Sequence, residues 1–260
     1  MRSLLRKPFR FFYYSLYGSK GKDVVVNNEK YRMSAYISRG VNPVLDETPY
    51  KILKNLVSNA SVVFDIGANV GIISVLISKS MKPQSKIYSF EPVSSTYKML
   101  ADNARVQRGN ATVIPFNLAL SNSIGDIYFT NRAVHTVNNI LRKPEADSIL
   151  VKSTTVDTFC IEHKVIPQVV KVDVEGAEYF VLEGMVQTLQ QNDCIVLVEI
   201  HSGMLGDFGV DEQQFEALLE KIGYHLYNIN GDELGYDKVM SNACVVLSKT
   251  PLDSSIFSIS

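Results

Sequence analysis

From about residue 45 onward the chain alternates short apolar runs with segments of helical periodicity, and no other feature of the sequence constrains its fold as strongly. Buried strands that alternate with helices build βαβ units, whose strands form a mostly parallel sheet. The sequence therefore predicts an α/β domain with a doubly wound sheet. The predicted strands lie at about 61–66, 86–91, 111–116, 125–130, 168–173, 194–201, 224–229 and 242–248, and the predicted helices at about 45–58, 70–80, 93–108, 176–190 and 211–222.

Length and composition fit a single globular domain. The chain has 260 residues, of which 46% are hydrophobic, and no internal repeat or Pro/Gly-rich linker divides it. Its 26 Lys and Arg residues nearly balance its 27 Asp and Glu residues, which argues against nucleic acid as a partner. The 3 cysteines lack metal-ligand spacing, and their odd number favours reduced thiols in a cytoplasmic protein. We therefore expect an N-terminal extension, residues 1–44, followed by one domain, residues 45–260.

The N-terminal segment carries the clearest charge asymmetry. Residues 1–22 have six basic residues and no acidic ones, so this segment is net +6 while the remainder is net −7. Aromatic residues are interleaved with the basic ones, as in segments that lie on an anionic membrane surface. The segment has neither a signal-peptide cleavage site nor the run of about 18 apolar residues that spans a bilayer. Two interpretations stay open: an arm that packs on the protein itself or on a second subunit, and a peripheral membrane contact.

The stretch VVFDIGANVGIIS, residues 62–74, is typical of a buried strand, a turn and the start of a helix. In a parallel sheet such a turn lies at the carboxyl edge, where ligands bind. Gly67 permits a tight turn and the close approach of a ligand, and Gly71 permits close packing of the helix. The helix N-terminus offers free N–H groups, and Asp65 places a carboxylate just before the turn. The turn is therefore a candidate ligand site.

Glu91 ends the next predicted strand, in KIYSFEP. In doubly wound folds an acid at this place accepts hydrogen bonds from the ribose of an adenosine-containing ligand. Dinucleotide sites carry three glycines as G-x-G-x-x-G, whereas this turn has only G-x-x-x-G. An acid beside the turn suits a methionine-derived cofactor, which presents an ammonium group instead of a pyrophosphate. A dinucleotide-dependent oxidoreductase and a non-catalytic cofactor-binding scaffold are the alternatives.

Six segments together resemble the FkbM family of S-adenosylmethionine-dependent methyltransferases, over about residues 60–202. They are VVFDIGANVGIIS, YSFEP, NLALSNSIGDIYF, STTVDTF, VVKVDVEGAEYFVLEGM and IVLVEIH. Their order and spacing carry the resemblance, and the Asp-x-Glu-Gly-x-Glu segment is the most distinctive. The resemblance implies a Rossmann-like methyltransferase sheet with an antiparallel last strand. It also implies S-adenosylmethionine as cofactor and O-methylation of a saccharide, glycolipid or polyketide-like hydroxyl.

By position, the resemblance implies three sets of cofactor-binding residues. Asp65, Gly67, Ala68, Asn69 and Gly71 would surround the methionine portion, Glu91 would hold the ribose, and Ala119 and Ser121 would border the adenine. The residue types of Ala119 and Ser121 suit a contact with adenine, because a small side chain permits close approach and a hydroxyl can pair with a ring nitrogen.

Chemistry is expected at the ends of two later strands, in KVDVEGAE and VEIH. Asp173 ends an apolar strand, where a carboxylate is costly unless it meets a ligand, a metal or a hydrogen-bond donor. Methyl transfer to a hydroxyl needs groups that position the acceptor and take its proton, and we expect Asp173, Glu175 and His201 to do this. A divalent cation held by Asp173 with Glu175 or His201 would be another way to acidify the hydroxyl.

Two further residues have an ordinary structural explanation beside a functional one. Glu178 is explained by a favourable interaction with the positive end of a helix dipole as well as by a role in the site. His135, in the segment AVHTVNN, is either a substrate contact or part of a polar surface connection.

Overall fold

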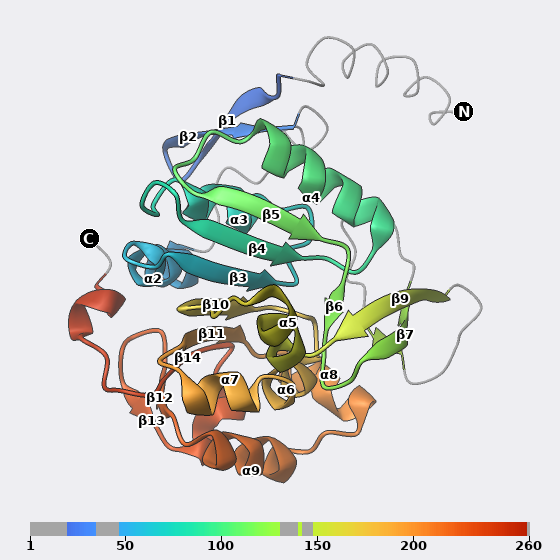
Figure 1. The fold of residues 1–260 in the computed structure, drawn as a ribbon. Helices are drawn as coiled ribbons and strands as arrows, with labels where there is room; N and C mark the ends of the chain where they lie inside the picture. The colour runs from blue at the N-terminus through green and yellow to red at the C-terminus, as the bar shows by residue number, and fades with distance from the viewer. Residues whose placement is uncertain (1–19, 35–46, 131–139, 142–147, 259–260) are drawn as a thin grey trace, which may run out of the picture.

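The computed structural model describes residues 20–34, 47–130, 140–141 and 148–258. Its main sheet consists of β3 (Val62–Ile66), β4 (Lys86–Phe90), β5 (Thr112–Phe116), β10 (Val169–Val172), β11 (Ile195–Glu199), β12 (His225–Tyr227), β13 (Glu233–Leu234) and β14 (Cys244–Ser248). The strand order is β13-β12-β14-β11-β10-β3-β4-β5 (Figure 1). Seven of these strands correspond to the predicted ones, with ends that differ by at most two residues.

The sheet is doubly wound and mostly parallel, as predicted. β3 pairs in parallel with β4 and β10, and β10 with β11, whereas β14 runs antiparallel to β11 and β12. The predicted antiparallel last strand is therefore confirmed. The chain builds β4 and β5 on one side of β3 and then crosses to build β10 and β11 on the other (Figure 1). The order of the chain thus reverses between β3 and β10, and open α/β sheets leave a ligand crevice at such a switch point.

Helices cover both faces of this sheet because successive strand residues point to opposite sides. One face packs α5 (Val156–His163), α6 (Glu178–Glu183), α7 (Val186–Gln191) and α9 (Glu212–Ile222) on residues such as Phe64, Val170 and Val198. The other face packs α2 (Glu47–Val57) and α3 (Ile72–Ser78) on Val63 and Leu197. The remaining helices are α4 (Ser94–Val106), α8 (Ser202–Leu205) and the 3-10 helices η1 (Gly206–Phe208), η2 (Tyr236–Ser241) and η3 (Ser254–Phe257).

A β-hairpin precedes the sheet, and the sequence did not predict it. It consists of β1 (Lys22–Val26) and β2 (Glu29–Met33), joined by two asparagines with positive φ. Val26, Tyr31 and Met33 are buried in the same apolar cluster as α2 and α3. Part of the segment that was assigned to the N-terminal extension therefore packs on the domain.

A second, smaller sheet follows β5. It contains β6 (Ala119–Leu120), β7 (Gly125–Thr130), β8 (Ile140–Leu141) and β9 (Ser148–Thr154) in the order β6-β9-β7-β8. Only β7 was predicted. One face buries Phe129 and Val151 against Val93, and the other leaves Tyr128 and Leu150 exposed.

The prediction of one helix over residues 176–190 is wrong, because two short helices, α6 and α7, occupy this range. Gly184 lies between them, and a Cβ there would overlap the carbonyl oxygen of Ser121. The Gly184 carbonyl accepts the amide of Asp157, whose carboxylate in turn accepts the amides of Gln187 and Thr188. Contacts with a distant segment thus end the first helix and begin the second.

Two other features concern the sequence predictions. The predicted strand 194–201 ends at Glu199, so His201 lies at the start of α8 rather than in the strand. Within the described part of the chain, no helix combines the length and the apolar character that crossing a membrane requires.

Candidate active site

The loop from Gly67 to Gly71 connects β3 to α3, and three of its residues have a left-handed backbone. The φ angles are 77° at Gly67, 50° at Asn69 and 83° at Gly71. A Cβ on Gly67 would overlap the backbone carbonyl oxygen of Asp173, so glycine allows this loop to touch the end of β10. Ala68 is buried in the loop and Asn69 is exposed. The predicted cofactor loop therefore lies at the switch point of the sheet.

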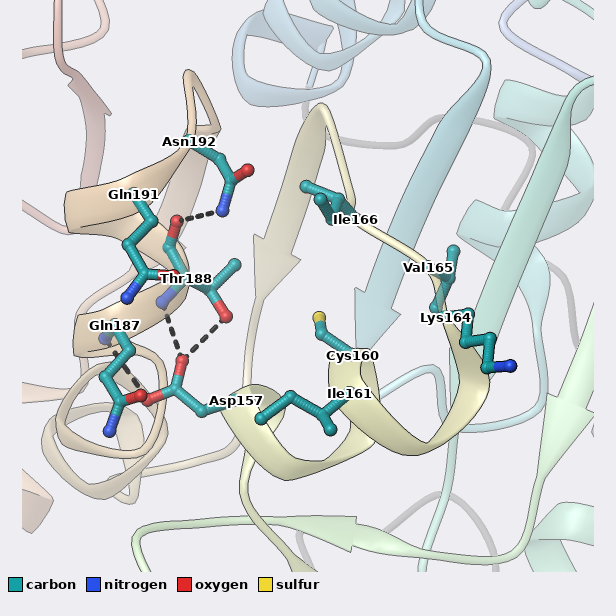
Figure 2. Close-up of a pocket in the computed structure, with 10 residues that line it drawn as sticks. All are labelled: Asp157, Cys160, Ile161, Lys164, Val165, Ile166, Gln187, Thr188, Gln191 and Asn192. Atoms are coloured by element: carbon teal, nitrogen blue, oxygen red, sulfur yellow. Dashed lines mark hydrogen bonds between the residues drawn. The ribbon is translucent and has the colours of Figure 1, made fainter.

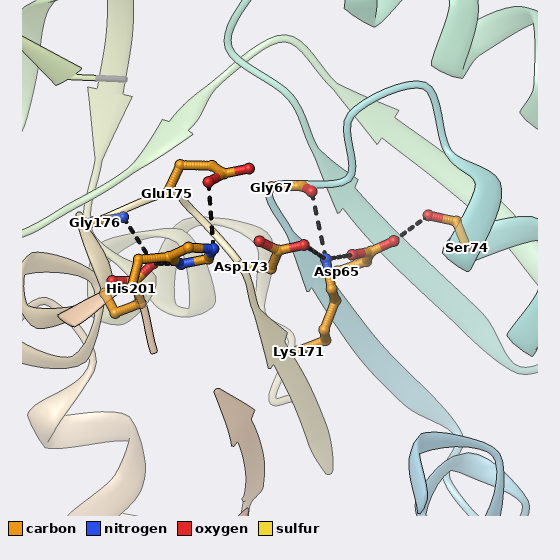
Figure 3. Close-up of polar contacts among 9 residues, drawn as sticks. Asp65, Gly67, Ser74, Lys171, Asp173, Glu175, Gly176 and His201 are labelled. Atoms are coloured by element: carbon orange, nitrogen blue, oxygen red, sulfur yellow. Dashed lines mark hydrogen bonds and ion pairs between the residues drawn. The ribbon is translucent and has the colours of Figure 1, made fainter. Parts of the chain in front are cut away.

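Asp65 is fully buried at the end of β3, and its two oxygens have different partners (Figure 3). The hydroxyl of Ser74 donates to Oδ2 at 2.5 Å, and the ammonium of Lys171 lies 3.5 Å from Oδ1. Burial by itself would lower the pKa of Lys171, but the carboxylates of Asp173 and Asp65 outweigh it and raise this pKa above its ordinary value. Both oxygens of Asp65 are therefore turned toward groups of the protein, one toward Ser74 and the other toward Lys171.

Glu91 follows β4 directly and is 7% exposed. The amide of Val93 donates to its Oε1 at 2.9 Å, and the amide of Asn69 also bonds to its carboxylate. Burial raises the pKa of Glu91 to about 7, although both amide donors oppose the rise. This carboxyl group lies beside the Gly67–Gly71 loop and titrates near neutral pH, so a hydroxyl donor would favour its ionised form.

Ala119 and Ser121 lie in the second sheet. Ala119 packs in an apolar cluster with Val93, two residues beyond Glu91. Ser121 is buried after β6, where its amide bonds to β9 and its hydroxyl to the side chain of Asn122 at 3.3 Å. Ala119 thus lies near the Glu91 end of the site, whereas the contacts of Ser121 belong to the second sheet.

Asp173 follows β10, and its side chain is 28% exposed. The next turn contains two residues with positive φ, 54° at Glu175 and 99° at Gly176. Such a backbone is costly for a residue other than glycine, and strain of this kind is concentrated at functional sites. The turn leaves the Glu175 carboxylate 3.3 Å from Nε2 of His201.

His201 has a carboxylate at each ring nitrogen. Its Nδ1 lies 2.9 Å from Oε1 of Glu178, a fully buried side chain that also accepts the amide of Gly176 at 3.0 Å. The hydrogen bond with Glu178 raises the pKa of His201 to about 9, burial opposes this, and the charges of Glu178 and Glu175 add to the rise. At neutral pH the ring is therefore an imidazolium that donates to Glu178 and forms an ion pair with Glu175, and it does not accept a proton in this state.

Glu199, at the end of β11, joins this group. Burial raises its pKa, and the negative charge of Asp173 adds to the rise. One ligand atom from each of Asp173, Glu199 and His201 can be chosen so that all three lie within 4.8 Å of one another. A set of one imidazole and two carboxylates suits several divalent cations. The candidate cation ligands therefore include Glu199, which the sequence did not single out.

Sequence reasoning missed Lys171, Ser74 and Glu199, and left the role of Glu178 open. Lys171 had a visible signal, since a lysine interrupts the apolar run VVKVDV. Glu199 stands in VEIH, where chemistry was expected, and Glu178 in the Asp-x-Glu-Gly-x-Glu segment, so only Ser74 had no sequence signal. His135 and residues 1–19 lie outside the described residues.

A separate cavity of about 410 Å³ lies between α5 and α7 (Figure 2). It is lined by Asp157, Cys160, Ile161, Lys164, Val165, Ile166, Gln187, Thr188, Gln191 and Asn192. No predicted site residue lines it, so it is distinct from the group at the switch point.

The chain is similar in sequence to known methyltransferases. A sequence model described as the methyltransferase FkbM domain matches residues 65–226. The chain is 34% identical to the hexuronic acid methyltransferase AglP of Haloferax volcanii, over 66% of this chain and 67% of that protein. It is 30% identical to the methyltransferase sdnD of Sordaria araneosa, over 67% of this chain and 77% of that protein.

Among solved structures, the chain is similar to a methyltransferase FkbM from Methylobacillus flagellatus, with 16% identity and a TM-score of 0.42. This similarity covers 73% of the chain but only 44% of that structure, so the chain spans less than half of its length. An O-methyltransferase from Bacillus cereus has 8% identity and a TM-score of 0.41, over 82% of this chain and 84% of that one.

Proposed function

The chain belongs to the FkbM methyltransferase family, and from this premise we propose that it is an S-adenosylmethionine-dependent O-methyltransferase. The observation that carries the proposal is the meeting of the Gly67–Gly71 loop, Glu91 and Asp173 at the switch point of the sheet. For the argument below we divide the site into two halves. The cofactor half consists of Asp65, the Gly67–Gly71 loop and Glu91, and the acceptor half consists of Asp173, Glu175, Glu178, Glu199 and His201.

The cofactor half fits this cofactor on its own chemistry. Glu91 is a buried carboxyl group suited to accept hydrogen bonds from ribose hydroxyls. Asp65 and Asp173 together exceed the charge of Lys171, so the region between them attracts a cation. A nicotinamide dinucleotide would instead bring a pyrophosphate to this negative region. These features favour the methionine-derived cofactor over the dinucleotide of an oxidoreductase.

Bound S-adenosylmethionine supplies an electrophilic methyl group on a sulfonium. Asp173 is our candidate for the group that takes the proton of the acceptor hydroxyl, because its carboxylate is partly exposed and its backbone touches the cofactor loop. His201 is held as an imidazolium by Glu178 and Glu175, so its role is to donate a hydrogen bond to the acceptor. Glu175 is the partner that His201 would release when an acceptor binds.

A divalent cation is the second version of this mechanism. Asp173, Glu199 and His201 would hold it, and its charge would acidify the hydroxyl. Two of the ligands are already engaged, Asp173 by Lys171 and His201 by Glu178 and Glu175. The cation-free version keeps the pairs of Asp173 with Lys171 and of His201 with Glu178, so we favour it. Loss of turnover on chelation, restored by magnesium, would instead support the cation.

The acceptor we propose is a hydroxyl of a saccharide or a glycolipid, and a polyketide-like hydroxyl is the alternative. The relative named a hexuronic acid methyltransferase supports the first class. The carboxylates of the acceptor half outnumber its one imidazolium, which disfavours a negatively charged acceptor group. We therefore expect the enzyme to methylate hydroxyls of neutral sugars in preference to those of acidic sugars. A panel of neutral and acidic sugars would test this preference.

Titration calorimetry tests the cofactor assignment. The full-length protein should bind S-adenosylmethionine and S-adenosylhomocysteine and should not bind NAD. Binding of NAD alone would support the oxidoreductase. Binding of S-adenosylmethionine with no methylation of any acceptor in the panel would support the non-catalytic scaffold.

The basic segment, residues 1–22, adds a proposal about location. We assign it a peripheral contact with the anionic surface of a membrane, which would hold a cytoplasmic enzyme near a glycolipid acceptor. Deletion of residues 1–19 should abolish co-sedimentation with vesicles of anionic lipid at low salt, and high salt should weaken binding of the full-length protein. Equal sedimentation of both forms would make the segment a structural arm.

A further inference from the structure

Lys171 is a buried cation in the middle of the main sheet. The other residues of β10 are three valines that are at most 2% exposed, and the side chain of Lys171 is 8% exposed. Burying an ammonium in a central strand is costly unless acceptors and negative charges surround it. The presence of lysine here therefore needs an explanation beyond packing.

The ammonium of Lys171 has three oxygen neighbours: it donates to two of them and forms an ion pair with the third (Figure 3). They are Oδ2 of Asp173 at 3.0 Å, Oδ1 of Asp65 at 3.5 Å and the carbonyl oxygen of Gly67 at 3.5 Å. Lys171 and Asp65 are also paired in register on adjacent strands, β10 and β3. The three neighbours come from both sides of the switch point, so one ammonium joins the cofactor half to the acceptor half.

Asp65 depends on this ammonium. Its Oδ1 is buried and makes no hydrogen bond to any described residue, while Oδ2 is occupied by Ser74. The remaining neighbour of Oδ1 is the ammonium, which therefore serves as the counter-charge of this carboxylate. Removing it would leave an unpaired buried charge beside the cofactor loop.

We propose that Lys171 is a positioning residue that holds Asp173 beside the Gly67–Gly71 loop and, with Asp65, sets the preference of the site for the charged cofactor over its neutral product. This inference rests on the proposed function. Lys171 remains protonated throughout and exchanges no proton with the acceptor. It fixes the position of the Asp173 carboxylate, and it sets the net charge of the region around Asp65 and Asp173.

The charge argument gives a quantitative series. Asp65, Lys171 and Asp173 sum to a net charge of −1 in the wild type. By the same count, Lys171→Met gives −2, Asp65→Asn gives 0, and the double variant Asp65→Asn/Lys171→Met returns to −1. S-adenosylmethionine carries one positive charge more than S-adenosylhomocysteine, on its sulfur. The ratio of the two affinities therefore reports the net charge near that sulfur, whereas a general loss of structure lowers both affinities together.

The experiment is titration calorimetry of the four proteins with both ligands, at low and at high salt. Relative to the wild type, Lys171→Met should raise the preference for S-adenosylmethionine by about tenfold, and Asp65→Asn should lower it by about tenfold, the order expected for unit charges at an effective dielectric of about 20. The double variant should recover the wild-type ratio. Lys249→Met removes an exposed lysine after β14 and is the matched control, with no expected change.

The outcomes separate the two proposals. Failure of the wild type to bind either ligand would overturn the proposed function. Normal binding by the wild type with the same ratio in all four proteins would overturn the role of Lys171 alone. If Lys171→Met does not fold, Asp65→Asn and the double variant still test the charge series, because neither leaves an unpaired carboxylate at residue 65.

The positioning role has its own readout. At saturating cofactor, the double variant should keep a wild-type affinity ratio but turn over about tenfold more slowly, because Asp173 has lost its partner. Full turnover in this variant would overturn the positioning role.

Discussion

The cofactor half and the acceptor half of the site are held together by different means. Residues of the cofactor half are close in sequence, along β3, β4 and the loop that follows β3. Backbone turns and amides fix the Gly67–Gly71 loop and Glu91, whereas Asp65 is held by Ser74 and Lys171. Residues of the acceptor half come from the ends of β10 and β11 and from the starts of α6 and α8, and side-chain ion pairs fix their positions. A change in the first half should therefore act on binding and folding, and a change in the second on turnover and pH dependence.

Gly67→Ala should have the largest effect, because it disturbs the backbone where the two halves meet. The added Cβ would overlap the carbonyl oxygen of Asp173, and φ of 77° is unfavourable for alanine. We expect a loss of about 3 kcal/mol in the free energy of unfolding, which lowers Tm by about 6–12 °C in a domain of this size. Thermal unfolding measures this loss of stability, and calorimetry with S-adenosylhomocysteine measures the effect of the variant on ligand binding.

Gly206→Ala is the matched control for this variant. A Cβ at Gly206 meets no atom within 4 Å, and its φ is −59°. It should leave Tm unchanged or raise it slightly. Equal stability of the two alanine variants would contradict the contact between Gly67 and Asp173.

Asp173→Asn should separate turnover from binding. Asparagine keeps the shape of the side chain but cannot take a proton, so the methylation rate should fall by at least about 100-fold while cofactor affinity stays within a few-fold. Rates are compared at saturating cofactor after the folded fraction has been checked, with the exposed Asp207→Asn as control. Wild-type turnover in folded Asp173→Asn would exclude the proposed role, and a loss of cofactor affinity alone would move Asp173 to the cofactor half.

These two halves also differ in how far the sequence predicted them. The turn at Gly67 and the acid at Glu91 were predictable because strand periodicity and glycine spacing are local signals. The ion pairs of Lys171 and the contact between Glu178 and His201 were not, since they depend on which strands are neighbours. The order β10-β3 in the sheet is a tertiary property that no local pattern encodes.

The same distinction between local and tertiary signals explains the errors in the predicted fold. The main strands and the helices α2, α3, α4 and α9 were predicted from periodicity, and α9 is further marked by a capping box at Asp211 and a left-handed Gly223. The second sheet was largely missed, because its strands β6 and β8 have two residues each and lack a measurable period. The break at Gly184 was missed because its causes, Ser121 and Asp157, are distant in sequence.

Glu91→Gln should weaken the cofactor half without unfolding it. The neutral amide removes charge-assisted hydrogen bonds to the ribose, so S-adenosylhomocysteine should bind more weakly by about 1–3 kcal/mol. Because the pKa of Glu91 is about 7, wild-type affinity should rise as pH increases through 7, and the variant should lose this dependence. The exposed Glu162→Gln is the control. Equal affinity in Glu91→Gln would remove this residue from the site.

Glu178→Gln should have the smallest effect, and the size of this effect should depend on pH. The folded pKa of His201, about 9, exceeds its ordinary value of 6.5, and Glu178 is the main cause. The ion pair therefore stabilises the fold fully below pH 6.5, and this stabilisation disappears as pH rises through 9. Loss of the pair should cost about 1–2 kcal/mol at pH 6, since solvent screens the partly exposed ring.

Denaturant unfolding of the wild type and Glu178→Gln between pH 6 and pH 9.5 measures this difference. Glu175→Gln, which removes the more exposed partner of the same ring, should show a smaller difference with the same sign. If the difference in the free energy of unfolding between the wild type and Glu178→Gln stays constant with pH, Glu178 contributes packing and not charge. His201 would then be a neutral imidazole near pH 7, and it would become a candidate for the proton acceptor in place of Asp173.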